Sequence, residues 1–234
     1  MKILILGGGG REHALAWAIK QNPKCDELLC APGNAGIAKI AECHELDIEN
    51  PSTVLDFVQT HKVDFVIVGP EAPLVAGVAQ SLREAGVTTF GPDKAAAQLE
   101  ASKNFTKEVC AQANAPTASY AYFTDLSSAK TYIQNQGVPI VIKADGLAAG
   151  KGVVVAMDLE TALGAVETMF GGEFGAAGAE VVIEEFMEGE EASLFVLCDG
   201  MTAVTIGTAQ DHKRAFNGDA GPNTGGMGAY SPAP

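Results

Sequence analysis

Residues 138–157 read VPIVIKADGLAAGKGVVVAM, two apolar runs joined by a glycine-rich turn. Each run is short and rich in Val and Ile, which predicts two β-strands. Lys143 leaves the first run and Lys151 enters the second, so two ammonium groups would flank the turn. The glycines that would let the backbone approach a polyanion closely are Gly146, Gly150 and Gly152. The pattern is compatible with a hairpin that covers phosphates, but this segment by itself is better explained as an ordinary glycine-rich hairpin.

The Walker A phosphate loop is excluded for this segment. That motif requires G-x-x-x-x-G-K-[ST]. Asp145 stands five residues before Gly150, and Gly152 rather than Ser or Thr follows Lys151. A nucleotide clamp built from two strands and their turn is the hypothesis that remains.

A second stretch, residues 179–197, is rich in carboxylates and reads AEVVIEEFMEGEEASLFVL. Carboxylates can accept hydrogen bonds from an adenine amino group or from ribose hydroxyls. The backbone around Phe186 and Met187 could pair with the edge of a purine in an apolar slot. A solvated acidic turn is the alternative, and we expect it for Glu188 and Glu190. Lysines in one segment and carboxylates in the other suit the two ends of ATP.

The order of these segments resembles that of the ATP-grasp ligases. Lys103 comes first, followed by KADGLAAGKGV at 143–153, the acidic stretch, and GPNTGGMGAYSP at 221–232. With GGGGREHALAW at 7–17 and GPEAPLVAG at 69–77, the chain resembles the glycinamide ribonucleotide synthetase family within that superfamily. The residues that this resemblance assigns to ATP are Lys103, Lys143, Gly146, Gly150, Lys151, Gly152, Glu184, Glu185, Phe186, Met187 and Glu191.

The resemblance also implies a reaction in purine biosynthesis. Glycine would attack the γ-phosphate of ATP to form glycyl phosphate, and 5-phosphoribosylamine would displace phosphate to form glycinamide ribonucleotide. The cofactors would be ATP and Mg2+ or Mn2+. Because the family continues beyond the GPNTGGMG loop with its metal ligands, we expect an amino-terminal part of a longer enzyme, inactive by itself, with those ligands beyond Pro234. Another ATP-grasp carboxylate-amine ligase is the alternative.

The first hundred residues alternate strand and helix patterns, which predicts a parallel sheet covered on both faces. A nicotinamide-binding domain would have the same alternation, so we tested its fingerprint. Starting from Gly7 and Gly9, Glu12 occupies the place of the third glycine, and Cys30-Ala31-Pro32 replaces the acidic residue that would bind ribose. The dinucleotide hypothesis is therefore disfavoured. The resemblance instead assigns the loops after the strands to substrate, through Gly9, Gly10 and Glu71.

The resemblance and the patterns together predict an α/β fold with two parts. A Rossmann-like parallel-sheet domain would occupy residues 1–101 and a connecting helix residues 102–122. An ATP-grasp flap lobe would occupy 123–189, and the incomplete start of the larger ATP-grasp lobe 190–234. Within them, we expect Ser127 or Ser128 to cap a helix and Asp199-Gly200 to form a two-residue hairpin turn.

The last segment, residues 211–234, has almost no apolar periodicity. A flexible tail is one interpretation. The resemblance favours a loop that lines the substrate site, and the residues it assigns there are Asp211, Lys213, Asn223, Thr224 and Gly225. We assign no catalytic side chain, because His13 and His212 are each isolated and isolated histidines more often pack than react.

Composition excludes several other classes. The chain has 15 Lys and Arg against 29 Asp and Glu, a net charge of −14, which argues against nucleic acid or an anionic membrane as a partner. Its five cysteines include no C-x-x-C pair, which argues against a zinc site and a disulfide framework. No apolar run approaches the length of a membrane span or a signal sequence. We expect a cytoplasmic protein with small-molecule partners.

Overall fold

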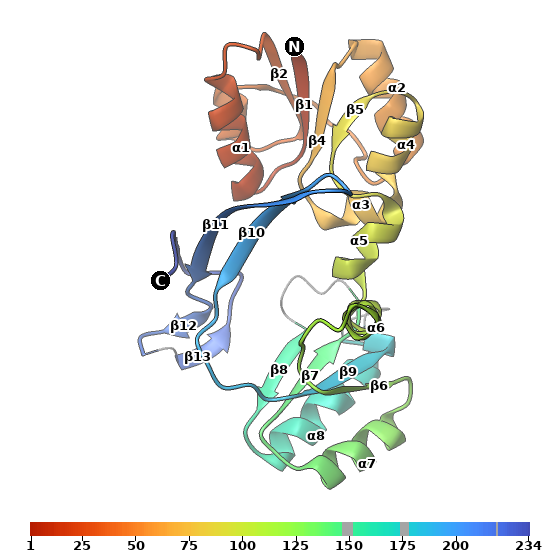
Figure 1. Ribbon diagram of the computed structural model, residues 1–234, viewed down its shortest axis with the longest axis vertical. Helices are drawn as coiled ribbons and strands as arrows, with labels where there is room; N and C mark the ends of the chain where they lie inside the picture. Colours follow the sequence, from red (N-terminus) through yellow and green to blue (C-terminus); the bar gives the residue numbers. More distant parts are fainter. Residues whose placement is uncertain (147–151, 174–177, 219) are drawn as a thin grey trace. The chain divides into compact units, whose positions relative to one another are not determined.

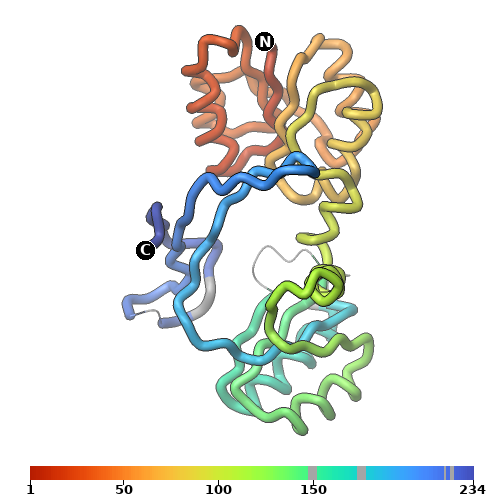
Figure 2. Tube along the Cα trace, viewed as in Figure 1, coloured from red at the N-terminus to blue at the C-terminus, as the bar shows by residue number. Residues whose placement is uncertain are grey.

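The computed structural model describes residues 1–146, 152–173, 178–218 and 220–234. The chain forms two compact units, Met1–Ala101 and Ser102–Pro234, and each is described by itself. Figure 2 traces the chain by residue number from the first unit, in red to yellow, to the second, in green to blue.

The first unit is built around a parallel sheet, as predicted. Its described strands have the order β3-β2-β1-β4-β5 (Figure 1). The strands are β1 (Lys2–Gly7), β2 (Glu27–Pro32), β3 (Glu42–Cys43), β4 (Phe65–Val68) and β5 (Thr88–Phe90). The helices are α1 (Gly10–Lys20), η1 (Ile37–Lys39), α2 (Pro51–His61), α3 (Glu71–Ala76), α4 (Val78–Glu84) and α5 (Lys94–Ala101).

Alternation along β1 divides its side chains between two cores. Leu4 and Leu6 pack with residues of α2 and α4, such as Val58. Ile3 and Ile5 pack on the other face with α1 and η1. Successive side chains of a strand point to opposite faces, so an apolar strand of this kind is buried on both sides. Full burial of one such side chain contributes about 1.5–3 kcal/mol, which explains why ILIL lies at the centre of the sheet.

The second unit contains a four-stranded sheet of order β6-β9-β7-β8. Its strands are β6 (Tyr120–Phe123), β7 (Ile140–Ala144), β8 (Val153–Ala156) and β9 (Val181–Glu185), and all its pairings are antiparallel. The helices of this part are α6 (Lys103–Ala113), α7 (Leu126–Gln136), α8 (Leu159–Thr168) and the short η2 (Met169–Glu173). β6 pairs with β9, so Tyr120–Phe123 belong to the same sheet as β7 and β8.

One face of this sheet holds the core of the lobe. Ile140 and Ile142 of β7 and Ile183 of β9 pack against apolar residues of α7 and α8. Figure 1 shows both helices on this same side of the sheet. Since side chains alternate along a strand, Lys143 and Glu184 must point to the opposite face.

Two local predictions were wrong in detail. Asp125, not Ser127 or Ser128, caps α7, because its carboxylate accepts a hydrogen bond from the Ser128 backbone N–H at 2.9 Å. Asp199 and Gly200 do not form a two-residue turn. The Asp199 carboxylate accepts hydrogen bonds from two backbone N–H groups further along the loop. The connection between β10 and β11 is therefore longer than the two residues predicted.

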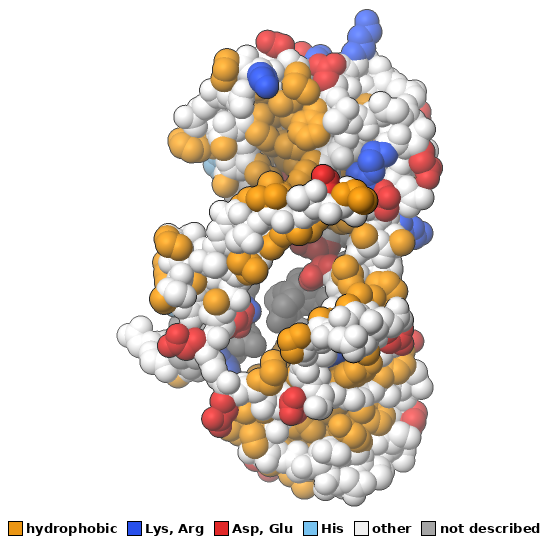
Figure 3. All heavy atoms as spheres, in the orientation of Figure 1, with side chains coloured by type: hydrophobic (Ala, Val, Ile, Leu, Met, Phe, Trp, Pro, Cys, Tyr) orange, Lys and Arg blue, Asp and Glu red, His pale blue; other side chains and the backbone are white. Residues whose placement is uncertain are grey.

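The carboxy-terminal segment is paired into strands in its described part. These are β10 (Ser193–Cys198), β11 (Ala203–Asp211), β12 (Arg214–Phe216), β13 (Ala220–Asn223) and β14 (Ala229–Tyr230). β10 pairs with β11, β11 with β14, and β12 with β13. The flexible-tail interpretation is therefore wrong for the described residues. Apolar side chains of β10 and β11 such as Phe195 and Ile206 are exposed, and hydrophobic groups appear along these strands in Figure 3.

Candidate nucleotide-binding site

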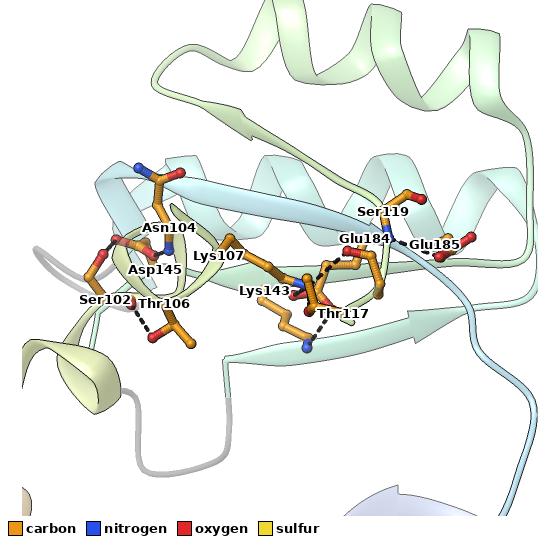
Figure 4. A network of polar contacts seen from close by, with 11 residues as sticks. Ser102, Asn104, Thr106, Lys107, Thr117, Ser119, Lys143, Asp145, Glu184 and Glu185 are labelled. Atoms are coloured by element: carbon orange, nitrogen blue, oxygen red, sulfur yellow. Dashed lines mark hydrogen bonds and ion pairs between the residues drawn. The ribbon is translucent and has the colours of Figure 1, made fainter. Parts of the chain in front are cut away.

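Two lysines share one buried glutamate on the face of the four-stranded sheet that α7 and α8 leave open (Figure 4). Lys143 Nζ lies 2.7 Å from Glu184 Oε2, and Lys107 Nζ lies 3.3 Å from Glu184 Oε1. β7 and β9 supply Lys143 and Glu184, and α6 supplies Lys107. In the antiparallel register Lys143 is opposite Val182, so Glu184 is its diagonal neighbour on the same face, within reach of a long side chain.

Burial makes this group of charges unusual. Glu184 and Lys107 are each 6% exposed. A buried carboxylate is costly unless its charge is compensated, and here two cations compensate it. From the sequence, Glu184 was predicted to bind the nucleoside end of ATP. In the structure, each of its two carboxylate oxygens instead contacts a lysine. Lys107 escaped sequence analysis because a lysine in an exposed-looking helix carries no signal of burial.

A second buried carboxylate holds the beginning of α6. Asp145 is 5% exposed, and it accepts hydrogen bonds from Ser102 Oγ and from the Asn104 backbone N–H, both at 2.8 Å. Ser102 in turn caps the helix by accepting from the Phe105 backbone N–H at 3.0 Å. A negative charge at a helix N-terminus is favourable because it complements the helix dipole. The end of β7 is thereby joined to α6 (Figure 4).

Lys103 is directed to the same end of β7. Its Nζ donates to the carbonyl oxygens of Asp145 at 3.4 Å and Gly146 at 3.2 Å. At the base of the hairpin, the Ala144 N–H donates to the Gly152 carbonyl at 2.8 Å. The structure thus brings Lys103, Gly146 and Gly152 to the end of the strand that carries Lys143. Gly150 and Lys151, also predicted to bind ATP, lie outside the described residues.

The rest of the acidic stretch has different surroundings. Glu185 is exposed and accepts a hydrogen bond from the Ser119 N–H at 2.8 Å. Phe186 is half-buried, and Met187 is exposed just after β9 ends. Glu191 forms an ion pair with Lys213. The predicted nucleoside-binding residues therefore divide between the end of β9 and the segment that leads into β10.

The carboxy-terminal loop is organised around the backbone of Lys213. The Thr224 N–H and hydroxyl both donate to the Lys213 carbonyl, at 2.7 and 2.9 Å. Asp211 ends β11, and Asn223 ends β13, where it is in register with Arg214. Of the residues predicted for substrate, the structure brings Lys213 and Thr224 together, and Gly225 follows them directly.

The three predicted substrate residues of the first unit lie where strands end. Gly9 and Gly10 begin α1 after β1, and Glu71 begins α3 after β4. Arg11 connects these loops, because it donates to Glu12 Oε1 at 2.8 Å and to Glu71 Oε1 at 3.0 Å. Burial pushes the pKa of Glu71 upward, but hydrogen bonds from Arg11 and from the backbone leave its pKa below the ordinary value. The carboxylate therefore stays ionised at neutral pH.

The side chain of Glu12, which stands where a dinucleotide fingerprint has its third glycine, is buried. It is 3% exposed, and its Oε2 accepts from the Gly9 N–H at 2.7 Å. A Cβ at Gly69 would lie 2.2 Å from Glu12 Oε1, and one at Gly7 would lie 2.7 Å from its Cγ. The side chain thus fills the space between the loops after β1 and β4, and the neighbouring glycines make room for it. In the sequence, Glu12 stands out only as a departure from that fingerprint.

Within the described residues, no helix is both long and apolar enough to cross a membrane. All five cysteines are free thiols. In the same described part, no group of three or more His, Cys, Asp or Glu could hold a metal ion.

Comparison with known proteins agrees with the resemblance. The family model for phosphoribosylglycinamide synthetase, N domain, matches residues 1–100, and the model for the ATP-grasp (A) domain of the same synthetase matches residues 101–234. The phosphoribosylamine–glycine ligase of Rhizobium meliloti is 61% identical over all 234 residues, and that of Mesorhizobium japonicum is 62% identical. This chain spans 55% of the length of each.

Solved structures show the same likeness. The crystal structure of phosphoribosylamine–glycine ligase from Thermotoga maritima matches all of this chain and 56% of its own, with a TM-score of 0.83 and 31% identity. A biotin carboxylase domain from Hydrogenobacter thermophilus, solved with MgADP, has a TM-score of 0.73 over 91% of this chain and 51% of its own at 17% identity, and it shares the fold alone. The chain belongs to the phosphoribosylglycinamide synthetase family, with that family's N domain followed by its ATP-grasp domain.

Proposed function

We propose that this chain binds ATP and takes part in the ligation of glycine to 5-phosphoribosylamine. The products would be glycinamide ribonucleotide, ADP and phosphate. One observation carries the proposal. Lys103 and Lys143 lie in the same lobe as Glu184 and the base of the hairpin, although both lysines are far from the acidic stretch in the sequence. Relatives of about 60% identity that are named phosphoribosylamine–glycine ligase support the choice of substrates. Free cysteines fit a reducing compartment, so we place the protein in the cytoplasm.

The chemistry of this ligation sets the requirements for the proposed site. The glycine carboxylate attacks the γ-phosphorus, the bond from that phosphorus to the β,γ-bridging oxygen breaks, and ADP leaves. The amine of phosphoribosylamine then attacks the acyl carbon of glycyl phosphate, and phosphate leaves as the amide forms. An anionic nucleophile approaching a triphosphate is repelled, so fixed positive charge lowers the barrier. Lys103 and Lys143 would supply that charge, and the hairpin would exclude water from the acyl phosphate.

The other assignments follow from position. Within this proposal, the backbone of the hairpin contacts phosphates through Gly146, Gly150, Lys151 and Gly152. The end of β9 and the following segment receive the nucleoside through Glu185, Phe186, Met187 and Glu191. The substrate residues would be Gly9, Gly10, Glu71, Asp211, Lys213, Asn223, Thr224 and Gly225. Magnesium or manganese would neutralise phosphate charge, but the described residues have no donor group of three that fits either ion, so no step is assigned to it.

Nucleotide binding tests the proposal on the 234-residue chain. Calorimetric titration should give binding of ATP and ADP, and Lys143→Ala should weaken ADP binding about 10- to 100-fold, because a charged hydrogen bond contributes about 1.5–3 kcal/mol. Lys130→Ala is the matched control. Lys130 forms an ion pair with Glu167 on the helical side of the same lobe, and its removal should leave the affinity unchanged. An unchanged ADP affinity in Lys143→Ala would count against this site.

Two further titrations separate the competing hypotheses. NADH should not compete with ADP, whereas a nicotinamide-binding domain would prefer NADH. Product analysis with the protein encoded by the complete reading frame should detect glycinamide ribonucleotide from glycine, ATP and phosphoribosylamine. If that product is absent, and an amide forms only when another carboxylic acid or another amine is supplied, the protein is another ATP-grasp ligase.

A further inference from the structure

Lys107 is a buried cation that the proposed reaction does not use. Its Nζ donates to Thr117 Oγ1 at 2.7 Å and to the Ala118 carbonyl at 3.0 Å, and it lies 3.3 Å from Glu184 Oε1. The same nitrogen lies 5.4 Å from the centre of the Tyr120 ring. With these contacts, Lys107 is held inside the lobe and cannot reach a ligand.

Lys143 meets the same carboxylate from a more open position. Its side chain is 27% exposed, compared with 8% for Lys107. Its Nζ donates to Glu184 Oε2 at 2.7 Å. Of the two lysines that share Glu184, Lys143 is therefore the one that can turn toward a ligand.

The three charges sum to one positive charge. If Lys143 moves its ammonium toward a phosphate, Glu184 keeps Lys107 as a partner, so no buried carboxylate is left without a counter-ion. Without Lys107, Glu184 would have Lys143 alone, and any phosphate would compete with a buried carboxylate for that ammonium. The fixed lysine thus determines whether the other lysine is available.

We propose that Lys107 is a positioning residue for nucleotide binding, which compensates Glu184 so that Lys143 can engage the phosphates. This inference rests on the proposed ATP site. It assigns Lys107 no contact with nucleotide, and it predicts that the effect of Lys107 depends on both Glu184 and the ligand's phosphates.

The experiment compares ADP with adenosine on the 234-residue chain. Lys107→Met should weaken ADP binding on the order of tenfold and leave adenosine binding unchanged, because adenosine has no phosphate for Lys143 to contact. Lys130→Met, which removes a surface lysine from the same lobe, should change neither affinity. A loss of both affinities in Lys107→Met would show a general distortion of the lobe and would overturn the proposal.

A double-mutant cycle measures the coupling between Lys107 and Glu184 in ADP binding, which a purely structural effect of Lys107 on packing would not produce. In a Glu184→Gln background there is no buried negative charge to compensate, so adding Lys107→Met should change ADP affinity less than about twofold. Equal effects of Lys107→Met in both backgrounds would overturn the proposal. If Lys107→Met does not fold, Lys107→Gln takes its place, since the amide still donates to Thr117 or Ala118 but carries no charge.

The outcomes also separate this inference from the proposed function. If Lys143→Ala weakens ADP binding and the Lys107 variants do not, the ATP site stands and the role of Lys107 is refuted. If the unmodified chain binds neither ATP nor ADP, the proposed function fails and the role of Lys107 fails with it.

Discussion

Removal of the Asp145 carboxylate should loosen α6 from the end of β7. Asp145→Ala deletes the acceptor of two hydrogen bonds, from Ser102 Oγ and the Asn104 N–H, both at 2.8 Å. Hydrogen bonds to a charged group contribute about 1.5–3 kcal/mol each, and the two half-buried donors would lose this partner. Ser102 continues to cap the helix through the Phe105 N–H, so the loss is smaller than the sum. We expect the local free energy of opening to fall by about 3 kcal/mol.

Hydrogen exchange with peptide-level mass spectrometry measures this directly. A change of about 3 kcal/mol corresponds to exchange on the order of 100-fold faster in peptides from α6. Asp145→Asn, which keeps the shape and loses the charge, should have about half the effect in free energy. Peptides from β1, in the first unit, provide an internal reference.

A matched control uses another aspartate that accepts two bonds. Asp199 accepts from the Met201 and Thr202 N–H groups, and it is exposed. Asp199→Ala should change exchange only in the connection between β10 and β11. Exchange of α6 within threefold of the unmodified chain in Asp145→Ala would refute the argument, because the buried bonds would then contribute little.

Three other predictions concern thiols, acid and a glycine. Burial raises the pKa of Cys30 to about 12, so iodoacetamide at neutral pH should label the exposed Cys198 and reach Cys30 only after unfolding; rapid labelling of Cys30 in the native chain would contradict its burial. A hydrogen bond from a backbone N–H in the first turn of α8 lowers the pKa of Asp158 below its ordinary value of 3.8. The stability that the ionised carboxylate contributes is therefore present above pH 3.8 and is lost as the pH falls through the lower pKa of the folded state. Acid titration followed by circular dichroism should show a less steep loss of folded signal in Asp158→Asn, and an identical curve would exclude the effect. Gly69→Ala should destabilise the first unit by about 1–3 kcal/mol in urea, because its Cβ would lie 2.2 Å from Glu12 Oε1; unchanged stability would mean that the buried glutamate can move aside.

Much of the fold was readable from periodicity. ILIL, LLCA and FVIV are continuous apolar runs, and each is a strand of the parallel sheet buried on both faces. IVIK and VVVA on either side of a glycine-rich turn are the paired strands β7 and β8. Cap positions and the hairpin connection were harder, because Asp, Ser and Gly neighbours compete for the same backbone donors.

The candidate site was only partly readable. Lys143 and Glu184 stood out by residue type and by resemblance, but their contact depends on the register of β7 against β9. Lys107 gave no signal, since KNFTKEVCAQA has the pattern of an ordinary surface helix. The sequence likewise gave no signal for the contacts of Arg11 and Glu12, because these contacts depend on how the loops after β1 and β4 lie together.

The sequence by itself determined the alternation that builds both sheets, the positions of their glycine-rich turns, and the family. Those features depend on residues that are close together along the chain, so local sequence patterns are enough to predict them. Only the tertiary structure decided that one buried carboxylate serves two lysines from a helix and a strand. Charge compensation depends on distance and on the exclusion of water, and both arise when segments distant in sequence pack together.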